Sequence, residues 1–179
     1  MSGRLIAVVG PSGVGKDTVM DAMIAADPRL GRVRRVITRP RTDSEDFQSV
    51  RIAEFEAMAR AGAFAIWWSA HGLSYGIPSG VEAELARGRD MLANLSRGVL
   101  GQAQARFPCL QVIALTARPE VLAARLSTRG REDHDDIARR LARAGAGVPD
   151  GVPTTMIDNS GPLDGTVQAA LAVLYPVRA

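Results

Sequence analysis

One strand–loop–helix segment constrains this sequence more than any other feature. Residues 5–9 (LIAVV) are all apolar, which is typical of a strand buried on both faces of a parallel sheet. They run directly into GPSGVGK at residues 10–16, which fits the pattern G-x-x-x-x-G-K, and residues 17–26 have the apolar spacing of a helix. In this context the N–H groups of the loop and the positive end of the helix bind phosphate. We therefore expect a phosphate-binding loop made of Gly10, Pro11, Ser12, Gly13, Val14, Gly15 and Lys16.

The residue after the loop lysine departs from the usual motif. Ser or Thr normally stands there and binds Mg²⁺, whereas this chain has Asp17 and then Thr18. A carboxylate beside a triphosphate is repelled unless a cation lies between them, so one interpretation is that Asp17 holds Mg²⁺ directly or through water. The other is that Asp17 interacts with the dipole of its own helix, which is worth about 0.3–1 kcal/mol. The sequence leaves both open, and residues 10–18 together form the expected nucleotide site.

Short apolar runs alternate with helical stretches along the rest of the chain. The runs lie at residues 5–9, 33–37, 91–95, 110–115 and 155–157. Strands joined by helical crossovers form parallel sheets with helices on both faces. The 179 residues have the length of one domain. We therefore predict a single domain, residues 1–179, with a three-layer α/β/α architecture around a five-stranded parallel sheet.

Local signals predict helix ends and two interruptions of this rhythm. Ser79 and Glu82 have the spacing of a capping box, Pro119 suits the first turn of a helix, and a last amphipathic helix covers Leu163–Leu174. Residues 62–78 (GAFAIWWSAHGLSYGIP) are strand-like and turn-rich, which indicates a small inserted substructure. Residues 127–136 (STRGREDHDD) are polar and indicate a mobile loop between two helices.

Composition excludes several classes of protein. The 22 Lys and Arg residues exceed the 19 Asp and Glu residues by only three charges, too few to predict nucleic-acid binding. Apolar runs stay well short of the roughly 18–20 residues that cross a bilayer. The single cysteine, Cys109, cannot form an internal disulfide, and no Cys/His cluster offers a zinc site. We expect a cytoplasmic protein, a monomer or homodimer, that binds neither nucleic acid nor membrane.

Arginines gather around the polar loop at residues 127–136. Arg129 and Arg131 lie within it, and further arginines follow on the next predicted helix. The helical period places Arg140 beside the buried face of that helix, whereas Arg139 and Arg143 point away from it. We therefore expect Arg140 to reach a ligand and the other two to be solvated.

Four motifs in order resemble the guanylate-kinase-like branch of the nucleoside monophosphate kinases. They are GPSGVGK at 10–16, ITRPR at 37–41, LSYGIP at 73–78, and RLSTRGRE followed by IARRLARA at 125–144. The resemblance implies a kinase that uses ATP and Mg²⁺, with an acceptor-binding region at about 33–88 and a lid at about 127–136. It also implies that Arg39, Arg41 and Tyr75 hold the acceptor's phosphate, and that Lys16, Arg129, Arg131 and Arg140 clamp the phosphates in transit.

The acceptor region departs from a guanylate kinase where the base would bind. The F-x-E glutamate that bonds guanine is replaced in Phe64-Ala65-Ile66, and the aspartate expected at the end of the third strand is Asn94. An apolar Ile66 would leave a buried guanine donor unpaired, which costs about 1–3 kcal/mol. Guanine is therefore a poor candidate for the acceptor base.

With these departures, the chain resembles the ribose 1,5-bisphosphate phosphokinases of phosphonate degradation. Four further motifs carry the same resemblance: GKD at 15–17, WSAHGL at 68–73, NLSR at 94–97 and RGRE at 129–132. The resemblance implies ATP-dependent formation of 5-phosphoribosyl 1-diphosphate (PRPP) from an acceptor that has two phosphates and no base. Asn94, Ser96 and Arg97 would lie at the carboxyl end of a strand, where α/β proteins bind ligands, and contact sugar hydroxyls and a phosphate. His71 would either bond an acceptor phosphate or shape the turn before Gly72. The alternatives are a nucleoside monophosphate kinase of altered base preference and a noncatalytic guanylate-kinase-like binding module.

Overall fold

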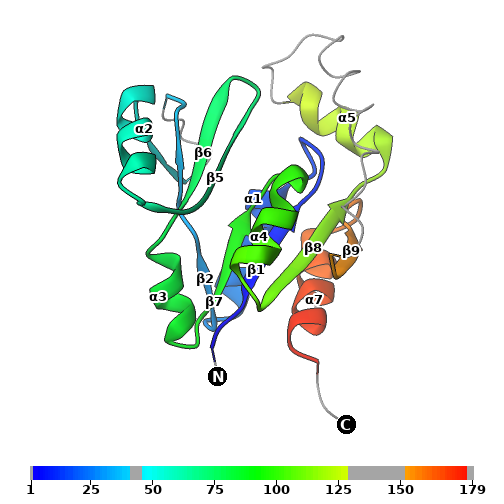
Figure 1. Cartoon of the computed structure of the whole chain (residues 1–179). Helices are drawn as coiled ribbons and strands as arrows, with labels where there is room; N and C mark the ends of the chain where they lie inside the picture. Colours follow the sequence, from blue (N-terminus) through cyan, green and yellow to red (C-terminus); the bar gives the residue numbers. More distant parts are fainter. Residues whose placement is uncertain (1, 41–45, 129–151, 177–179) are drawn as a thin grey trace.

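A five-stranded parallel sheet lies at the centre of the molecule, in the strand order β2-β7-β1-β8-β9 (Figure 1). The strands are β1 (Leu5–Val9), β2 (Leu30–Arg32), β7 (Asp90–Asn94), β8 (Leu110–Thr116) and β9 (Thr154–Asp158). This computed structural model describes residues 2–40, 46–128 and 152–176. All four strand pairings within the sheet are parallel, so the carboxyl ends of its strands meet at one edge.

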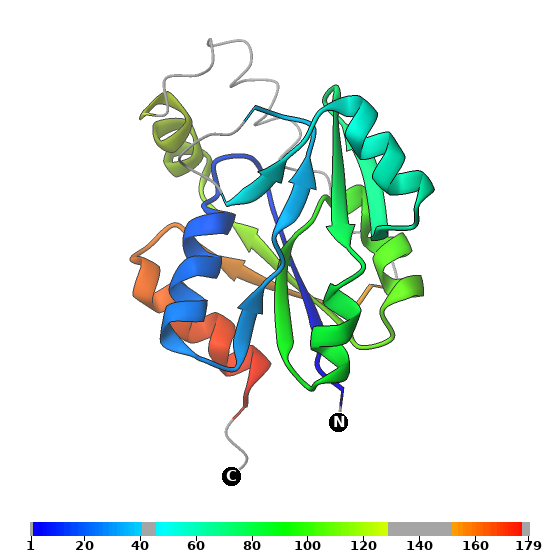
Figure 2. The ribbon, with the colours of Figure 1, turned by 90° about the vertical axis from the view of Figure 1, so that its left-hand side faces the viewer.

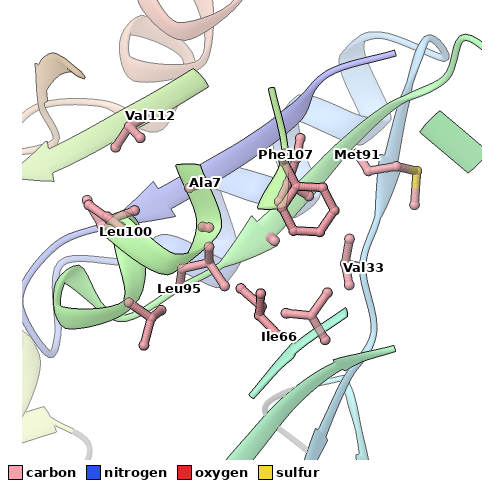
Figure 3. Close-up of a cluster of buried hydrophobic side chains, with 14 of the residues drawn as sticks. Ala7, Val33, Ile66, Met91, Leu95, Leu100, Phe107 and Val112 are labelled. Carbon is pink, nitrogen blue, oxygen red and sulfur yellow. The ribbon is translucent and has the colours of Figure 1, made fainter. Parts of the chain in front are cut away.

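Helices cover both faces of this sheet because each face of β1 is apolar. Ile6 and Val8 pack with α1 (Lys16–Ala26) and α7 (Leu163–Leu174), which lie side by side (Figure 2). The alternate residues of β1 pack on the other face with α4 (Leu100–Arg106), as Figure 3 shows for Ala7 and Leu100. The helices α1 and α7, although far apart in the sequence, therefore form one layer on the same face of the central sheet.

A second, four-stranded sheet carries the inserted region, in the order β4-β3-β6-β5. Its strands are β3 (Arg35–Ile37), β4 (Phe47–Ser49), β5 (Phe64–Ala70) and β6 (Leu73–Pro78). One face is covered by α2 (Ile52–Arg60). Phe55 of this helix packs against Val36 and Phe64 of the sheet. The other face, with Ile66, belongs to the cluster that reaches the central sheet (Figure 3).

A two-residue turn joins β5 to β6. Ala70 pairs with Leu73, and the residues between them, His71 and Gly72, have φ angles of 53° and 73°. Two left-handed residues in this position form the turn that matches the twist of a hairpin. His71 is exposed there, which agrees with the interpretation that it shapes the turn.

Several local predictions are confirmed. The first helix, the last helix Leu163–Leu174 and the start of α5 (Pro119–Thr128) at Pro119 agree with the sequence signals. Residues 62–78 form the β5–β6 hairpin and not a crossover helix, as predicted. Among the described residues, no helix is long and apolar enough to span a bilayer.

Three local predictions are wrong in detail. Residues 33–37 are not a strand of the central sheet: β2 ends at Arg32, and β3 begins the second sheet at Arg35. Ser79 and Glu82 form no capping box, because Gly80 is the N-cap of α3 (Val81–Ala86) and the Glu82 carboxylate pairs with Arg106 at 2.5 Å. Ser127 and Thr128 belong to α5 and not to a loop, and residues 129–136 lie outside the described part of the chain.

Candidate active site

The glycine-rich loop connects the carboxyl end of β1 to α1, as predicted. Gly15 is the N-cap of α1 in the left-handed conformation, with φ 92° and ψ 28°. A Cβ at Gly10, where φ is 150°, would lie 2.5 Å from the carbonyl oxygen of Leu115 in β8. Both positions therefore need glycine. Gly15 needs it for its left-handed backbone conformation, and Gly10 needs it both for its positive φ and for its close approach to β8.

Lys16 folds back over this loop. Its Nζ donates hydrogen bonds to the carbonyl oxygens of Gly10 at 3.0 Å and Pro11 at 3.1 Å. The ammonium group therefore lies across the loop whose N–H groups bind phosphate in proteins of this kind.

Two side chains from distant segments brace the loop through one carbonyl group. Val14 O accepts hydrogen bonds from Asn159 Nδ2 at 2.8 Å and from Arg125 Nη1 at 3.2 Å. Arg125 also donates to the Asn159 carbonyl oxygen at 3.0 Å, and Asn159 Oδ1 accepts from Thr166 Oγ1 at 2.8 Å. Asn159 is buried, so these contacts tie the loop to α5, to the end of β9 and to α7.

A cavity of about 470 Å³ opens beside the braced loop. Its lining residues are Gly13, Gly15, Thr18, Ala124, Arg125, Asn159, Gly161 and Leu163. A volume of this size is within the range of small-molecule and cofactor sites. The cavity is therefore a candidate for the base and sugar of a nucleotide whose phosphates lie on the loop.

Asp17 is held by two neighbours at the carboxyl edge of the sheet. Its Oδ1 pairs with Arg32 Nη2 at 2.5 Å, and Asn94 Nδ2 donates to Oδ1 at 3.3 Å and to Oδ2 at 3.2 Å. Arg32 also pairs with Asp21, one turn further along α1. A carboxylate has about four acceptor positions, so Asp17 retains capacity on Oδ2. The described residues contain no group of three or more His, Cys, Asp or Glu side chains that could hold a metal.

Tyr75 and Arg39 lie on one face of the second sheet. Tyr75 in β6 is directly opposite Ile37 in β3 and Trp68 in β5, and its ring stacks on Trp68 with 5.3 Å between centroids. Arg39, two residues after Ile37, has its Cζ 4.6 Å from the ring centroid of Phe47. The expected acceptor residues therefore stand on an aromatic surface.

The other predicted residues fall into two groups. Ser96 and Arg97 follow β7 at the start of a 3-10 turn (Arg97–Val99) and are half-buried, close in sequence to Asn94. Arg41, Arg129, Arg131 and Arg140 lie outside the described residues.

Sequence reasoning missed four residues of this site. Arg32 is the last residue of β2, whose position the sequence did not establish, and Asn159 directly follows β9, where the predicted strand at 155–157 could have marked it as a candidate. Arg125 precedes the polar loop in the sequence, and no sequence pattern indicates that it braces the phosphate loop at Val14. Arg35 precedes the ITRPR motif, and nothing in the sequence distinguishes it from the neighbouring arginines.

The fold and the loop define the class: this is a P-loop kinase, with its nucleotide loop at the carboxyl edge of a parallel sheet. The crystal structure of guanylate kinase from Anaplasma phagocytophilum superposes with a TM-score of 0.71 at 17% identity, covering 97% of this chain and 85% of that one. A gluconokinase from Sinorhizobium meliloti 1021 gives 0.55 at 19% identity, with 97% and 91% covered. These structures share the fold.

Closer relatives define the family. Ribose 1,5-bisphosphate phosphokinase PhnN from Ruegeria sp. (strain TM1040) is 52% identical over 179 residues, which cover 99% of this chain and 94% of that protein. The protein of the same name from Rhizobium etli (strain CIAT 652) is 48% identical, with 96% and 89% covered. The chain belongs to the ribose 1,5-bisphosphate phosphokinase family. No family model matches it.

Proposed function

We propose that this chain transfers the γ-phosphoryl group of ATP to ribose 1,5-bisphosphate. An oxygen of the 1-phosphate forms a bond to the γ-phosphorus, and the bond between that phosphorus and the β,γ-bridging oxygen breaks. ADP leaves with the electron pair, and the other product is 5-phosphoribosyl 1-diphosphate. Similarity to phosphokinases of this name along nearly the whole chain supports the proposal.

One observation favours this acceptor over a nucleotide. Ile66, at the position of a base-reading glutamate, is 2% exposed and lies in the cluster against which Tyr75 packs. A nucleotide base at this face would contact methyl groups where the donors on its polar edge need hydrogen-bond acceptors. Each donor left unpaired would cost about 1–3 kcal/mol of binding free energy. A pentose without a base has no such requirement.

ATP occupies the donor side in this proposal. Its triphosphate lies on residues 10–18, and its adenosine fills the cavity beside Gly13 and Arg125. Asp17 fits a role toward Mg²⁺, because Oδ2 can accept a hydrogen bond from a water of the hydrated ion while Arg32 and Asn94 fix the carboxylate. Bound Mg²⁺ would neutralise charge on the β- and γ-phosphates.

The protein's own contribution is positioning and charge stabilisation. The attacking oxygen is already an anion, so the reaction needs no general base. Lys16 supports the phosphate in transit together with Arg129, Arg131 and Arg140, which we assign to the lid.

We assign the acceptor's attacking phosphate to Arg39, Arg41 and Tyr75. The amide N–H of Asn94 is used by Asp17, so Asn94 contributes its carbonyl oxygen to a sugar hydroxyl, with Ser96 and Arg97 nearby in sequence. His71 remains a candidate contact at the hairpin tip. We place the enzyme in the cytoplasm, as a monomer or homodimer that binds neither nucleic acid nor membrane.

An acceptor panel tests this function. Initial rates of ADP release are measured with Mg-ATP and either ribose 1,5-bisphosphate, GMP or UMP at equal concentrations. We expect ribose 1,5-bisphosphate to exceed both nucleotides by at least about tenfold, since each unpaired base donor costs about that factor. A faster reaction with GMP or UMP would contradict the proposal.

A further inference from the structure

The proposed acceptor has two phosphates. Arg39, Arg41 and Tyr75 are assigned to the attacking one, whereas Arg97 and His71 are candidate phosphate contacts that are not assigned to either phosphate. The second phosphate needs its own cationic partner, because an anion that leaves water for a binding site is stabilised only when it is paired. The strand register of the second sheet identifies a candidate. It lies on the same face as Tyr75 and Arg39.

Arg35 is on that face. Tyr75 is directly opposite Ile37, and side chains opposite each other in an antiparallel pair project from the same face. Residues two apart on a strand share a face, so Arg35 projects with Ile37 and Tyr75. Its Cζ lies 5.9 Å from the ring centroid of Tyr75, which stacks on Trp68. The guanidinium of Arg35 therefore lies near the ring of an expected acceptor residue.

Arg35 and Arg39 are held by different aromatic rings. The Arg39 guanidinium lies over Phe47, which is paired with Arg35 across β3 and β4, and the Arg35 guanidinium lies near Tyr75. Two separately supported guanidiniums on one face can each take one of the acceptor's two phosphates. Arginine is suited to the task because its planar fork donates two parallel hydrogen bonds to a phosphate.

We propose that Arg35 binds the second phosphate of the acceptor, the one that does not attack ATP, and thereby selects a bisphosphorylated pentose. This inference rests on the proposed function. The attacking phosphate stays with Arg39 and Tyr75. Arg35 thus determines specificity and takes no part in bond making.

The test compares two ligands that differ only in the second phosphate. Binding of ribose 1,5-bisphosphate and of ribose 1-phosphate to the full chain is measured by titration calorimetry for the wild type and Arg35→Gln. Hydrogen bonds to charged groups are worth a factor of about 10 to 100, so the Kd of the bisphosphate should rise by that factor. The Kd of ribose 1-phosphate should change less than threefold.

Arg34→Gln is the matched control. Arg34 is the adjacent residue, its side chain is 53% exposed, and it pairs with Asp46 at 2.9 Å. Its replacement removes the same charge from the same segment and should leave the Kd of both ligands within twofold of the wild type. Arg35→Lys, which keeps the charge but loses the fork, should give an intermediate Kd for the bisphosphate.

Three outcomes overturn the inference. Equal losses for both ligands in Arg35→Gln would make Arg35 a structural residue, and no loss for either would remove it from the site. A wild type that binds both ligands equally would mean that the second phosphate is not recognised. Turnover of the wild type is a separate measurement: tight binding without transfer to ribose 1,5-bisphosphate would reject the proposed function and leave the binding role of Arg35 standing.

Discussion

Replacement of Asn159 by alanine tests whether the brace holds the phosphate loop. The side chain is 4% exposed, donates to Val14 O at 2.8 Å and accepts from Thr166 Oγ1 at 2.8 Å. Alanine removes both hydrogen bonds, at about 0.5–1.5 kcal/mol each. Val14 O still accepts from Arg125 at 3.2 Å and Thr166 Oγ1 still reaches Asp158 O at 3.4 Å, so neither partner is left fully unsatisfied. We expect a loss of about 2 kcal/mol in the free energy of unfolding.

Urea unfolding followed by the fluorescence of Trp67 and Trp68 measures this loss. The midpoint should fall with an unchanged slope, which is the signature of altered stability in a two-state transition. Ser160→Ala is the control: its hydroxyl accepts from the Arg118 N–H at 2.8 Å and donates to Asp158 Oδ1 at 2.6 Å, both as solvent-exposed hydrogen bonds, and its removal should cost at most about 1 kcal/mol. ATP binding should also weaken in Asn159→Ala, because the amide lies 3.0 Å from the Cβ position of Gly15 and packs directly on the loop. An unfolding free energy within about 0.5 kcal/mol of the wild type would refute the reasoning.

Three further predictions concern the metal, the lid and acid stability. Asp17→Asn should raise the Mg²⁺ concentration needed for half-maximal turnover, and an unchanged titration would remove its role toward the metal. Arg129→Ala, Arg131→Ala and Arg140→Ala should each reduce turnover by up to about 10³-fold with an unchanged urea midpoint; full activity in all three would reject the lid assignment. Burial opposes ionisation of Asp90, but hydrogen bonds from Arg4 and Tyr175 outweigh it and hold the pKa of Asp90 below its usual value. This carboxylate therefore stabilises the fold at neutral pH and loses its contribution as pH falls through its folded pKa. Arg4→Gln should accordingly lower the urea midpoint more at pH 7 than at pH 3, and equal shifts would contradict this account.

The sequence predicts the central sheet well where a strand is buried on both faces. Residues 5–9 are apolar throughout, and 91–95 and 110–115 are apolar except for Asn94 and Gln111, because helices cover both sides of β1, β7 and β8. The second strand was misplaced because Leu30–Arg32 is short and contains Gly31. A Cβ at Gly31 would lie 2.6 Å from Met91 Sδ, so the residue that weakens the strand signal leaves room for the Met91 side chain. Val36 and Ile37 are apolar as well, but they belong to β3 of the other sheet.

The candidate site could be predicted where its residues are consecutive in the sequence. The phosphate loop has a fixed spacing, so residues 10–18 could be assigned from the sequence. At Val14, the brace connects the loop to Arg125, 111 positions further along the chain, and to Asn159, 145 positions further along. No local sequence pattern predicts contacts between residues so far apart. The pairing of Asp17 with Arg32 likewise depends on where β2 ends, which the sequence did not establish. Arg35 could be selected from its neighbours only after the register placed it on the face of Tyr75.

Phosphorus NMR of the complete reaction tests the central claim most directly. The full chain is incubated with Mg-ATP and ribose 1,5-bisphosphate, and the phosphorus signals of all products are assigned. The account predicts that the signal of the 1-phosphate is replaced by that of a diphosphate on the sugar, with one ADP formed for each diphosphate and the 5-phosphate unchanged. ADP that accumulates with inorganic phosphate alone, or a diphosphate that forms at the 5-position, would contradict it.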